Sequence, residues 1–137
     1  MVMTRLFVAL ILAHLWTSSK AEWVKVETPD REFQLYADTA KINILGSNRI
    51  GMWDLKDFTV EQEISGARYV SEKSHREYDC KENRYRDLAW MWMSESMGKG
   101  DVVVSIIING IPADWNSLKP SDKYYSLLRM ACIGHDR

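Results

Sequence analysis

The two cysteines of this 137-residue chain, Cys80 and Cys132, constrain its fold more than any other feature. A bond between them would close a loop of about 50 residues, which in the chain-entropy model stabilises a fold by about 4 kcal/mol. Cysteines pair in oxidising compartments and stay reduced in the cytosol, so an exported chain with an even pair is expected to form a disulfide. The alternative, a redox pair, is disfavoured because the two are not spaced as Cys-x-x-Cys.

The N-terminal segment has the pattern of a secretory signal peptide. Arg5 supplies a positive start, residues 6–16 form an apolar run, and small and polar residues follow as far as Ala21. Ser19 and Ala21 are the small residues that precede a signal-peptidase site, so we expect cleavage before Glu22. An uncleaved N-terminal anchor is the alternative, although the apolar run of about 11 residues is short of the roughly 20 that a membrane span needs.

Cleavage would leave residues 22–137 as one mildly acidic domain. The chain has 18 basic and 19 acidic residues, and removal of Arg5 and Lys20 with the signal leaves 16 against 19, a net charge of −3. This balance argues against a nucleic-acid binder that works by neutralising phosphates. No later stretch is long and apolar enough to span a membrane. No cysteine lies directly after the apolar run, so we expect no lipid anchor and place the protein in the periplasm or at the cell surface.

Most of the mature chain has the alternating pattern of half-buried strands. The expected strands are residues 23–27, 33–38, 42–45, 50–58, 67–80, 84–93 and 102–108. Residues 59–66 are polar and end in Ser-Gly, so we expect a loop there. The pattern of residues 67–80 places polar and apolar side chains on the same face, which a bulge midway would resolve by switching faces.

Residues after Pro120 predict the only clear helix. Ser121 is a suitable N-cap, and Gly134 is a suitable stop. The residues between them that share one apolar stripe are Tyr124, Leu127, Leu128 and Ala131, with Cys132 at its border. A disulfide would join the last turn of this helix to the end of the strand before Cys80. The predicted fold class is α+β, an antiparallel sheet of about six strands with one C-terminal helix packed on it.

Several short motifs follow one another in a particular order in the second half of the chain. They are Glu77-Tyr78-Asp79-Cys80, Arg84-Tyr85-Arg86, Met97-Gly98-Lys99-Gly100, Trp115, and Pro120-Ser121 before the helix that ends at Cys132. In this order they resemble the surface-adhesin protein E family of exported bacterial domains, and the resemblance extends over roughly residues 22–132. It implies a sheet with a helix held by a disulfide, and adhesion to host proteins at the bacterial surface.

The sequence contains no recognisable catalytic constellation. His75 is the only histidine between the signal and the C-terminal tail, whereas a metal site needs three or four converging ligands. The nucleophile elbow, phosphate loop and His-Glu-x-x-His motifs are absent from the sequence. We therefore predict no enzyme activity, no catalytic residues, no cofactor and no bound metal ion.

Two arginines are candidates for contact with a partner. Arg84 and Arg86 share one face of an expected strand, about 7 Å apart. They are suited to clamp an anion or a carboxylate, which the guanidinium group binds well. Alternatively, they pair with acids on the neighbouring strand, such as Glu77 or Asp79. The sequence leaves both interpretations open.

Two expected strands have more apolar residues than a sheet with one solvent-exposed face requires. Residues 88–93 form an unbroken apolar run, and residues 102–108 are apolar except for Ser105. Such strands need cover on both faces, and one helix covers only one. Trp90 and Trp92 each carry about 150–250 Å² of surface, so together they would make a patch near the upper range for a monomer.

Three explanations account for this apolar second face. The sheet curls so that Trp23 or the loop of residues 59–66 closes over it, the face forms a homodimer interface, or it binds a partner or an apolar ligand. We expect an exported, non-enzymatic protein-interaction domain with a protein partner such as a host matrix protein. Its candidate contact residues are Arg84, Arg86, Trp90 and Trp92. The alternatives are a soluble periplasmic binding or envelope-maintenance protein with the same fold and, less favoured, a small-ligand carrier.

Overall fold

One antiparallel sheet and one helix make up residues 21–135, the part of the chain that the computed structural model describes. The elements are β1 (Trp23–Val26), β2 (Phe33–Asp38), β3 (Asn43–Gly46), β4 (Arg49–Ile64), β5 (Ala67–Asp79), β6 (Arg84–Met93), the short 3-10 turn η1 (Ser96–Gly98), β7 (Val102–Ile107), β8 (Asn116–Ser117) and α1 (Tyr125–Cys132). Residues 1–20 of the expected signal peptide lie outside the described part. No helix within residues 21–135 is both long and apolar enough to cross a membrane.

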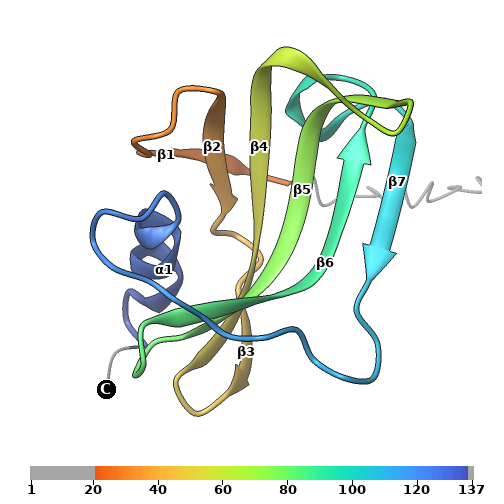
Figure 1. Ribbon diagram of the computed structural model, residues 1–137. Coiled ribbons are helices and arrows are strands. Elements are labelled where there is room, and N and C mark those ends of the chain that lie inside the picture. Colours follow the sequence, from red (N-terminus) through yellow and green to blue (C-terminus); the bar gives the residue numbers. More distant parts are fainter. Residues whose placement is uncertain (1–20, 136–137) are drawn as a thin grey trace, which may run out of the picture.

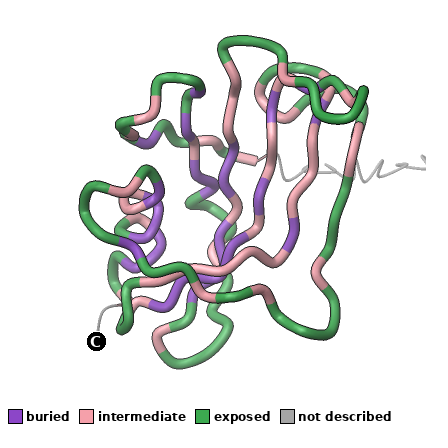
Figure 2. The backbone as a smooth tube through the Cα atoms, viewed as in Figure 1, coloured by how far each residue is buried: buried purple, intermediate pink, exposed green. Residues whose placement is uncertain are grey.

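The strand order is β1-β2-β4-β5-β6-β7, with β3 beside β4 and β8 beside β6. The long strands β4, β5 and β6 bend, so that the sheet curves around α1 (Figure 1). Buried residues gather where α1 faces the sheet, whereas β7 is exposed along most of its length (Figure 2). The core cluster consists of Val26, Phe33, Leu35, Ala37, Ile50, Met52, Tyr78, Leu118, Tyr124, Leu127, Leu128, Ala131 and Cys132. The predicted α+β class is therefore confirmed, with six strands along the main path and two short additions.

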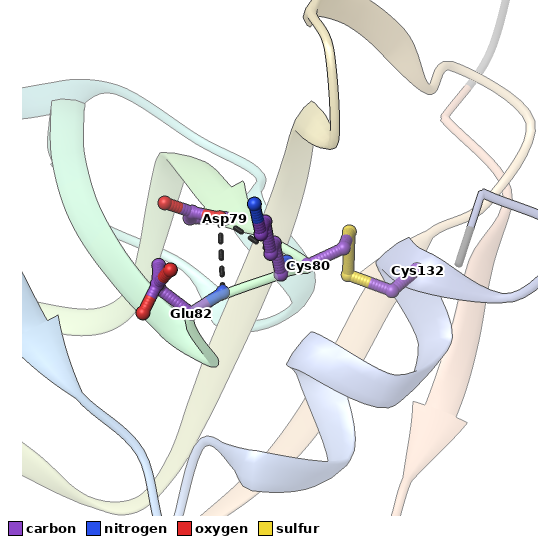
Figure 3. The surroundings of a disulfide bond; sticks show 5 residues. Asp79, Cys80, Glu82 and Cys132 are labelled. Atoms are coloured by element: carbon purple, nitrogen blue, oxygen red, sulfur yellow. Dashed lines mark hydrogen bonds between the residues drawn. A yellow bond between two sulfur atoms is a disulfide. The ribbon is translucent and has the colours of Figure 1, made fainter. Parts of the chain in front are cut away.

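A disulfide joins the sheet to the helix, as predicted from the two cysteines. Cys80 directly follows β5 and Cys132 ends α1; their sulfur atoms are bonded and their Cα atoms are 5.6 Å apart (Figure 3). The Asp79 carboxylate accepts hydrogen bonds from the backbone N–H groups of Lys81 and Glu82, both at 3.1 Å. These bonds fix the turn that follows β5, and so they fix the position from which Cys80 reaches the helix.

The helix begins later than its sequence indicated. Ser121 does not cap it; α1 starts at Tyr125, with Tyr124 at the N-cap position. The preceding residues form a separate turn instead, in which the Asp122 carboxylate accepts a bond from the backbone N–H of Lys119 at 2.6 Å. An aspartate that bonds local backbone competes with helix formation, which explains the three-residue difference. The apolar stripe itself is confirmed, because its inward residues are buried.

The expected loop at residues 59–66 is wrong, because β4 continues to Ile64 and turns into β5 at Ser65-Gly66. No residue of β4 from Thr59 to Ile64 is buried, and Val60 and Ile64 are 68% and 50% exposed. A strand that is wet on both faces needs no alternation, so the sequence pattern gave no signal. The turn is made by two residues with left-handed backbone, Ser65 at φ 50° and Gly66 at φ 81°.

The bulge expected within β5 lies in its partner. Residues of β5 pair continuously with β4 from Asp79 to Ser71, so β5 does not switch faces in this stretch, and the register with β4 shifts only beyond Ser71. In the pairing with β6, His75 lies opposite Ala89 and Arg76 opposite Asp87, which leaves Leu88 as the extra residue. Of the polar residues of β5 that disturbed the pattern, Arg76 and Glu72 are largely buried with ion-pair partners, whereas Arg68 is exposed.

The face of the sheet opposite α1 is covered in part by the turn between β6 and β7, and not by residues 59–66. The Asp57 carboxylate accepts bonds from the Ser96 hydroxyl at 2.7 Å and from the Met97 N–H at 2.9 Å, and the Gly98 N–H donates to the Ser71 hydroxyl at 2.9 Å. Trp23, which we expected near this face, lines a pocket of about 280 Å³ there with Trp53, Met91 and neighbouring residues. The apolar face for which three explanations were offered is a different one, because Trp90 and Trp92 lie opposite Ser74 and Glu72 on the side of α1.

Loss of the disulfide should destabilise the domain without changing its fold class. We expect Cys132→Ser combined with Cys80→Ser to lower the free energy of unfolding by about 4 kcal/mol, because the open chain gains the conformational freedom that the closed loop lacks. Urea unfolding followed by tryptophan fluorescence measures this change. Reductant should destabilise the wild type and leave the double variant unaffected; equal unfolding midpoints for the two proteins would contradict the prediction.

Candidate interaction surface

The structure does not bring the four predicted contact residues together. Arg84 and Arg86 pair with Asp79 and Glu77, which lie on the face of β5 away from α1. After the bulge at Leu88, the side chains of β6 change parity, so that Trp90 and Trp92 lie opposite Ser74 and Glu72 on the helix side. A single flat partner cannot contact both pairs.

The arginines form the cross-strand pairs that were one of the two sequence interpretations. The Nε atom of Arg84 lies 3.0 Å from Oδ2 of Asp79, and that of Arg86 lies 2.6 Å from Oε2 of Glu77. Hydrogen bonds from the Arg84 side chain and from backbone N–H groups outweigh the effect of burial and hold the pKa of Asp79 below its ordinary value. Both acids are buried, so each needs its arginine as a counterion. The two guanidinium groups are therefore less available to bind an external anion.

A tryptophan that sequence reasoning did not assign to a site lies against these arginines. The guanidinium carbons of Arg84 and Arg86 are 4.5 Å and 4.3 Å from the centre of the Trp115 ring, and that of Arg49 is 5.6 Å away. Arginine stacks favourably on indole, so the contacts of Trp115 with these arginines hold the segment between β7 and α1 against the sheet. The pairing of β8 with the start of β6 does the same from the backbone.

Beneath the start of α1 lies a buried ion pair. Nε of Arg76 is 2.7 Å from Oδ2 of Asp54, and both side chains are almost inaccessible to solvent. The guanidinium carbon of Arg76 also lies 4.1 Å from the centre of the Tyr124 ring. Burial by itself would lower the pKa of Arg76, but the Asp54 carboxylate and nearby groups outweigh it and hold the pKa well above the ordinary value. Arg76 is therefore charged, and the fold supplies its counterion.

A second ion pair continues from the first toward the edge of the sheet. Nζ of Lys56 lies 2.8 Å from Oε1 of Glu72, and the indole N–H of Trp92 donates to Oε2 of Glu72 at 2.9 Å. Burial acts to raise the pKa of Glu72, but the charge of Lys56 and the two hydrogen bonds outweigh it, so the pKa lies below its ordinary value. Trp92 also stacks on Tyr69, with ring centres 4.3 Å apart. Trp92 is thus fixed by a hydrogen bond at its indole N–H and by ring stacking on Tyr69.

A pocket of about 220 Å³ separates the helix from the outer strands. It is lined by Lys56, Glu72, Ser74, Arg76, Tyr85, Asp87, Trp90 and Tyr124. Its charged groups already form pairs with one another, since Arg76 also lies 3.5 Å from Asp87. Within residues 21–135 no group of three or more His, Cys, Asp and Glu side chains converges on a possible metal position. His75 lies on the other face, stacked on Trp53, and burial lowers its pKa.

Beyond this pocket, the helix side of the sheet is apolar and open. Trp90 pairs with Ile106 and Trp92 with Val104 across β6 and β7, so these four side chains share one face. Trp90 and Val104 are half-buried and Ile106 is 40% exposed. We call Trp90, Val104 and Ile106 the outer apolar strip. Of the predicted contact residues, Trp90 alone belongs to it.

The Glu72 contacts should make the domain sensitive to acid. The pKa of Glu72 is lower in the folded than in the unfolded chain, so its contribution to stability is present above its ordinary pKa near 4.5 and is lost as pH falls through the folded value. We expect Glu72→Gln to lower the free energy of unfolding at neutral pH by about 1–3 kcal/mol and to flatten its fall as the pH drops below about 5.

Urea unfolding at several pH values measures this dependence. Glu61→Gln is the matched control, because Glu61 is about half exposed and pairs loosely with Arg68 at 3.7 Å. It should leave both the stability and its pH dependence nearly unchanged. If Glu72→Gln kept the acid sensitivity of the wild type, the assigned role of Glu72 would be wrong.

Comparison with solved structures identifies the same fold. The structure of Haemophilus influenzae protein E matches with a TM-score of 0.58 and 12% identity, over 83% of this chain and 96% of that one. A second crystal form matches with a TM-score of 0.54 and 15% identity, over 83% and 99%. Protein E from non-typeable Haemophilus influenzae matches with a TM-score of 0.51 and 14% identity, over 83% and 86%. At these identities the similarity shows the fold alone.

The sequence itself gives the family. A search of curated proteins finds no significant match. The sequence profile described as surface-adhesin protein E matches residues 23–133, which is nearly all of the part that the structure describes. The resemblance noted in the ordered motifs of the second half is thereby confirmed, and this chain belongs to the surface-adhesin protein E family.

Proposed function

We propose that this protein is an exported, non-enzymatic interaction domain that binds host proteins as an adhesin does. The observation that carries the proposal is the outer apolar strip, Trp90, Val104 and Ile106, which stays open beside a helix that covers only the inner part of the same face. Solvent-exposed apolar surface of this kind, adjoining polar groups, is typical of sites for protein partners. Membership of an adhesin family supports the same conclusion.

The surroundings of the strip favour a protein over a small ligand. The adjacent pocket, of about 220 Å³, is smaller than the roughly 300–1,000 Å³ of typical small-molecule sites. Its charged side chains pair with one another, so they offer no unpaired group to orient a ligand. An apolar strip with a polar border has the anatomy of a protein interface, in which a dry centre is surrounded by a wet rim.

Arg84 and Arg86 belong to a different surface. They lie on the other face of β6, pair with buried acids and stack on Trp115. We propose that their part is to hold Trp115 and the segment around it, and that contact with the partner is made by the strip around Trp90. Trp92 supports the strip from within, through its bonds to Glu72 and its stacking on Tyr69.

Loss of the Trp90 side chain should weaken binding to host proteins. We expect the mature domain to bind at least one of immobilised collagen, fibronectin and laminin, and Trp90→Ser to weaken that binding at least tenfold, as loss of an aromatic anchor does. Surface plasmon resonance measures the affinity. Trp53→Ser makes the same change on the opposite face and should bind like the wild type. Unchanged binding by Trp90→Ser would contradict the assigned surface, and no binding to the panel would contradict an adhesive role.

Location decides between adhesion and a role in the periplasm. With a C-terminal epitope tag in a Gram-negative host, we expect protease added to intact cells to remove the tag, because an adhesin must face outward. A cytosolic enzyme and a known periplasmic protein, probed in the same cells, establish that the envelope is intact. If the tag is protected and the protein is released by osmotic shock, the adhesive proposal fails and a soluble periplasmic binding or envelope-maintenance function replaces it.

A further inference from the structure

The last strand of the sheet, β7, has an open edge. It pairs with β6 on one side, and no strand among residues 21–135 pairs with its other side. The strand is exposed on both faces: Val102, Ile106 and Ile107 are 54%, 40% and 67% accessible (Figure 2). An open edge is a row of backbone donors and acceptors ready to pair with another extended chain.

The backbone groups that face outward can be assigned from the register. The N–H of Ile108 donates to the carbonyl of Leu88 at 2.9 Å, and Ile106 lies opposite Trp90 in the same register. In an antiparallel pair the bonded positions alternate, so the N–H and C=O groups of Val104 and Ile106 point toward β6. Those of Ser105 and Ile107 therefore point away from the sheet, at the spacing that a further strand requires.

The chemistry of this edge is unusual for a protein that must stay soluble. No charged residue lies between Asp101 and Asp114, so β7 carries none of the lysines or prolines that normally blunt an edge strand. The strand at the opposite end of the sheet, β1, is less suited to pairing with a further strand, because it has only four residues and includes Lys25. The two end strands of the main path thus differ. The branch strand β3 is also exposed and uncharged but, like β1, has only four residues, so β7 is the longest uncharged edge among the described residues.

We propose that β7 takes up an extended, uncharged segment of a partner protein as an additional strand. This inference rests on the proposed function and specifies how the partner is bound. Backbone hydrogen bonds to Ser105 and Ile107 would supply affinity with little dependence on sequence. The side chains of the added strand would extend the outer apolar strip beside Ile106 on one face and continue beside Ile107 on the other. A charged side chain at either place would lose its water without gaining a partner, which selects uncharged segments.

The dimensions of the edge favour a partner segment over a second copy of this chain. A stable interface between folded proteins contains about 20–30 residues on each side. Two β7 strands pairing edge to edge would supply six residues each, together with few neighbours. A flexible segment, in contrast, can both pair with the edge and lie over the strip beside it.

Amide hydrogen exchange measured by NMR tests strand addition directly. The probe is a synthetic peptide of alternating valine and threonine, as long as β7, with a lysine at each end for solubility. We expect saturating peptide to slow exchange of the Ser105 and Ile107 amides at least tenfold and to leave the Val104, Ile106 and Lys25 amides unchanged. The same peptide with N-methylated backbone should protect none of them. Equal exchange with and without the unmodified peptide would overturn the proposal.

Two variants of the edge give a second, independent reading. Ser105→Pro removes an outward N–H, and Ile107→Lys places a charge on the edge; each should weaken binding of the peptide at least tenfold. Ile111→Lys is the matched control, because Ile111 is 90% exposed and lies beyond the strand. Wild-type binding by both edge variants would overturn the proposal. So would a concentration-dependent dimer that Ile107→Lys abolishes, since the occupant would then be a second copy.

The outcomes separate this inference from the proposed function. If a matrix protein binds and loses affinity in Trp90→Ser but not in the two edge variants, adhesion stands and strand addition is wrong. If the peptide protects the edge amides while no matrix protein binds, strand addition stands and host adhesion is wrong.

Discussion

The buried pair of Arg76 and Asp54 is the interaction on which the arrangement of helix and sheet depends. Two charges withdrawn from water must lie together, and removing one partner of such a pair typically costs about 3–5 kcal/mol. The pair joins β4 to β5 on the helix side and lies under Tyr124, the residue from which α1 starts. A shift of one residue between the strands would turn one charge to the opposite face, so the pair also fixes the register of the sheet.

The size of the helix explains why half of its side of the sheet stays open. Six strands spaced about 4.8 Å apart make a sheet about 24 Å wide, whereas a helix is about 10 Å in diameter. With eight residues, α1 packs against β4 and the end of β5, and the disulfide ties it to Cys80, directly after β5. The chain offers no second helix in its described part, so the face of β6 and β7 around Trp90 is left without cover. The same sheet thus provides both the core and the candidate contact surface.

Features that follow from local chemistry were predictable from the sequence, and features that depend on distant partners were not. The disulfide, the apolar stripe of the helix and the bounds of β6 were foreseen, because pairing of cysteines and periodicity are visible in a single chain. The burial of Arg76 was not, because its counterion Asp54 is 22 residues away and neither residue signals the other. The division of the four contact residues between two faces followed from one bulge residue, Leu88, which has no distinctive signature.

The apolar residues of β6 and those of β7 differ in how far the fold buries them. In β6 it is largely used: Ala89 and Met93 are buried, and Trp92 is fixed by Glu72 and Tyr69. In β7 it is not used by the fold, because Ile106 and Ile107 remain exposed on both faces of an uncharged edge. Exposed β-branched residues on an open edge promote association and contribute little to the stability of the domain that carries them. A requirement for folding alone therefore explains β6 and does not explain β7, whereas the binding function that we propose accounts for the difference.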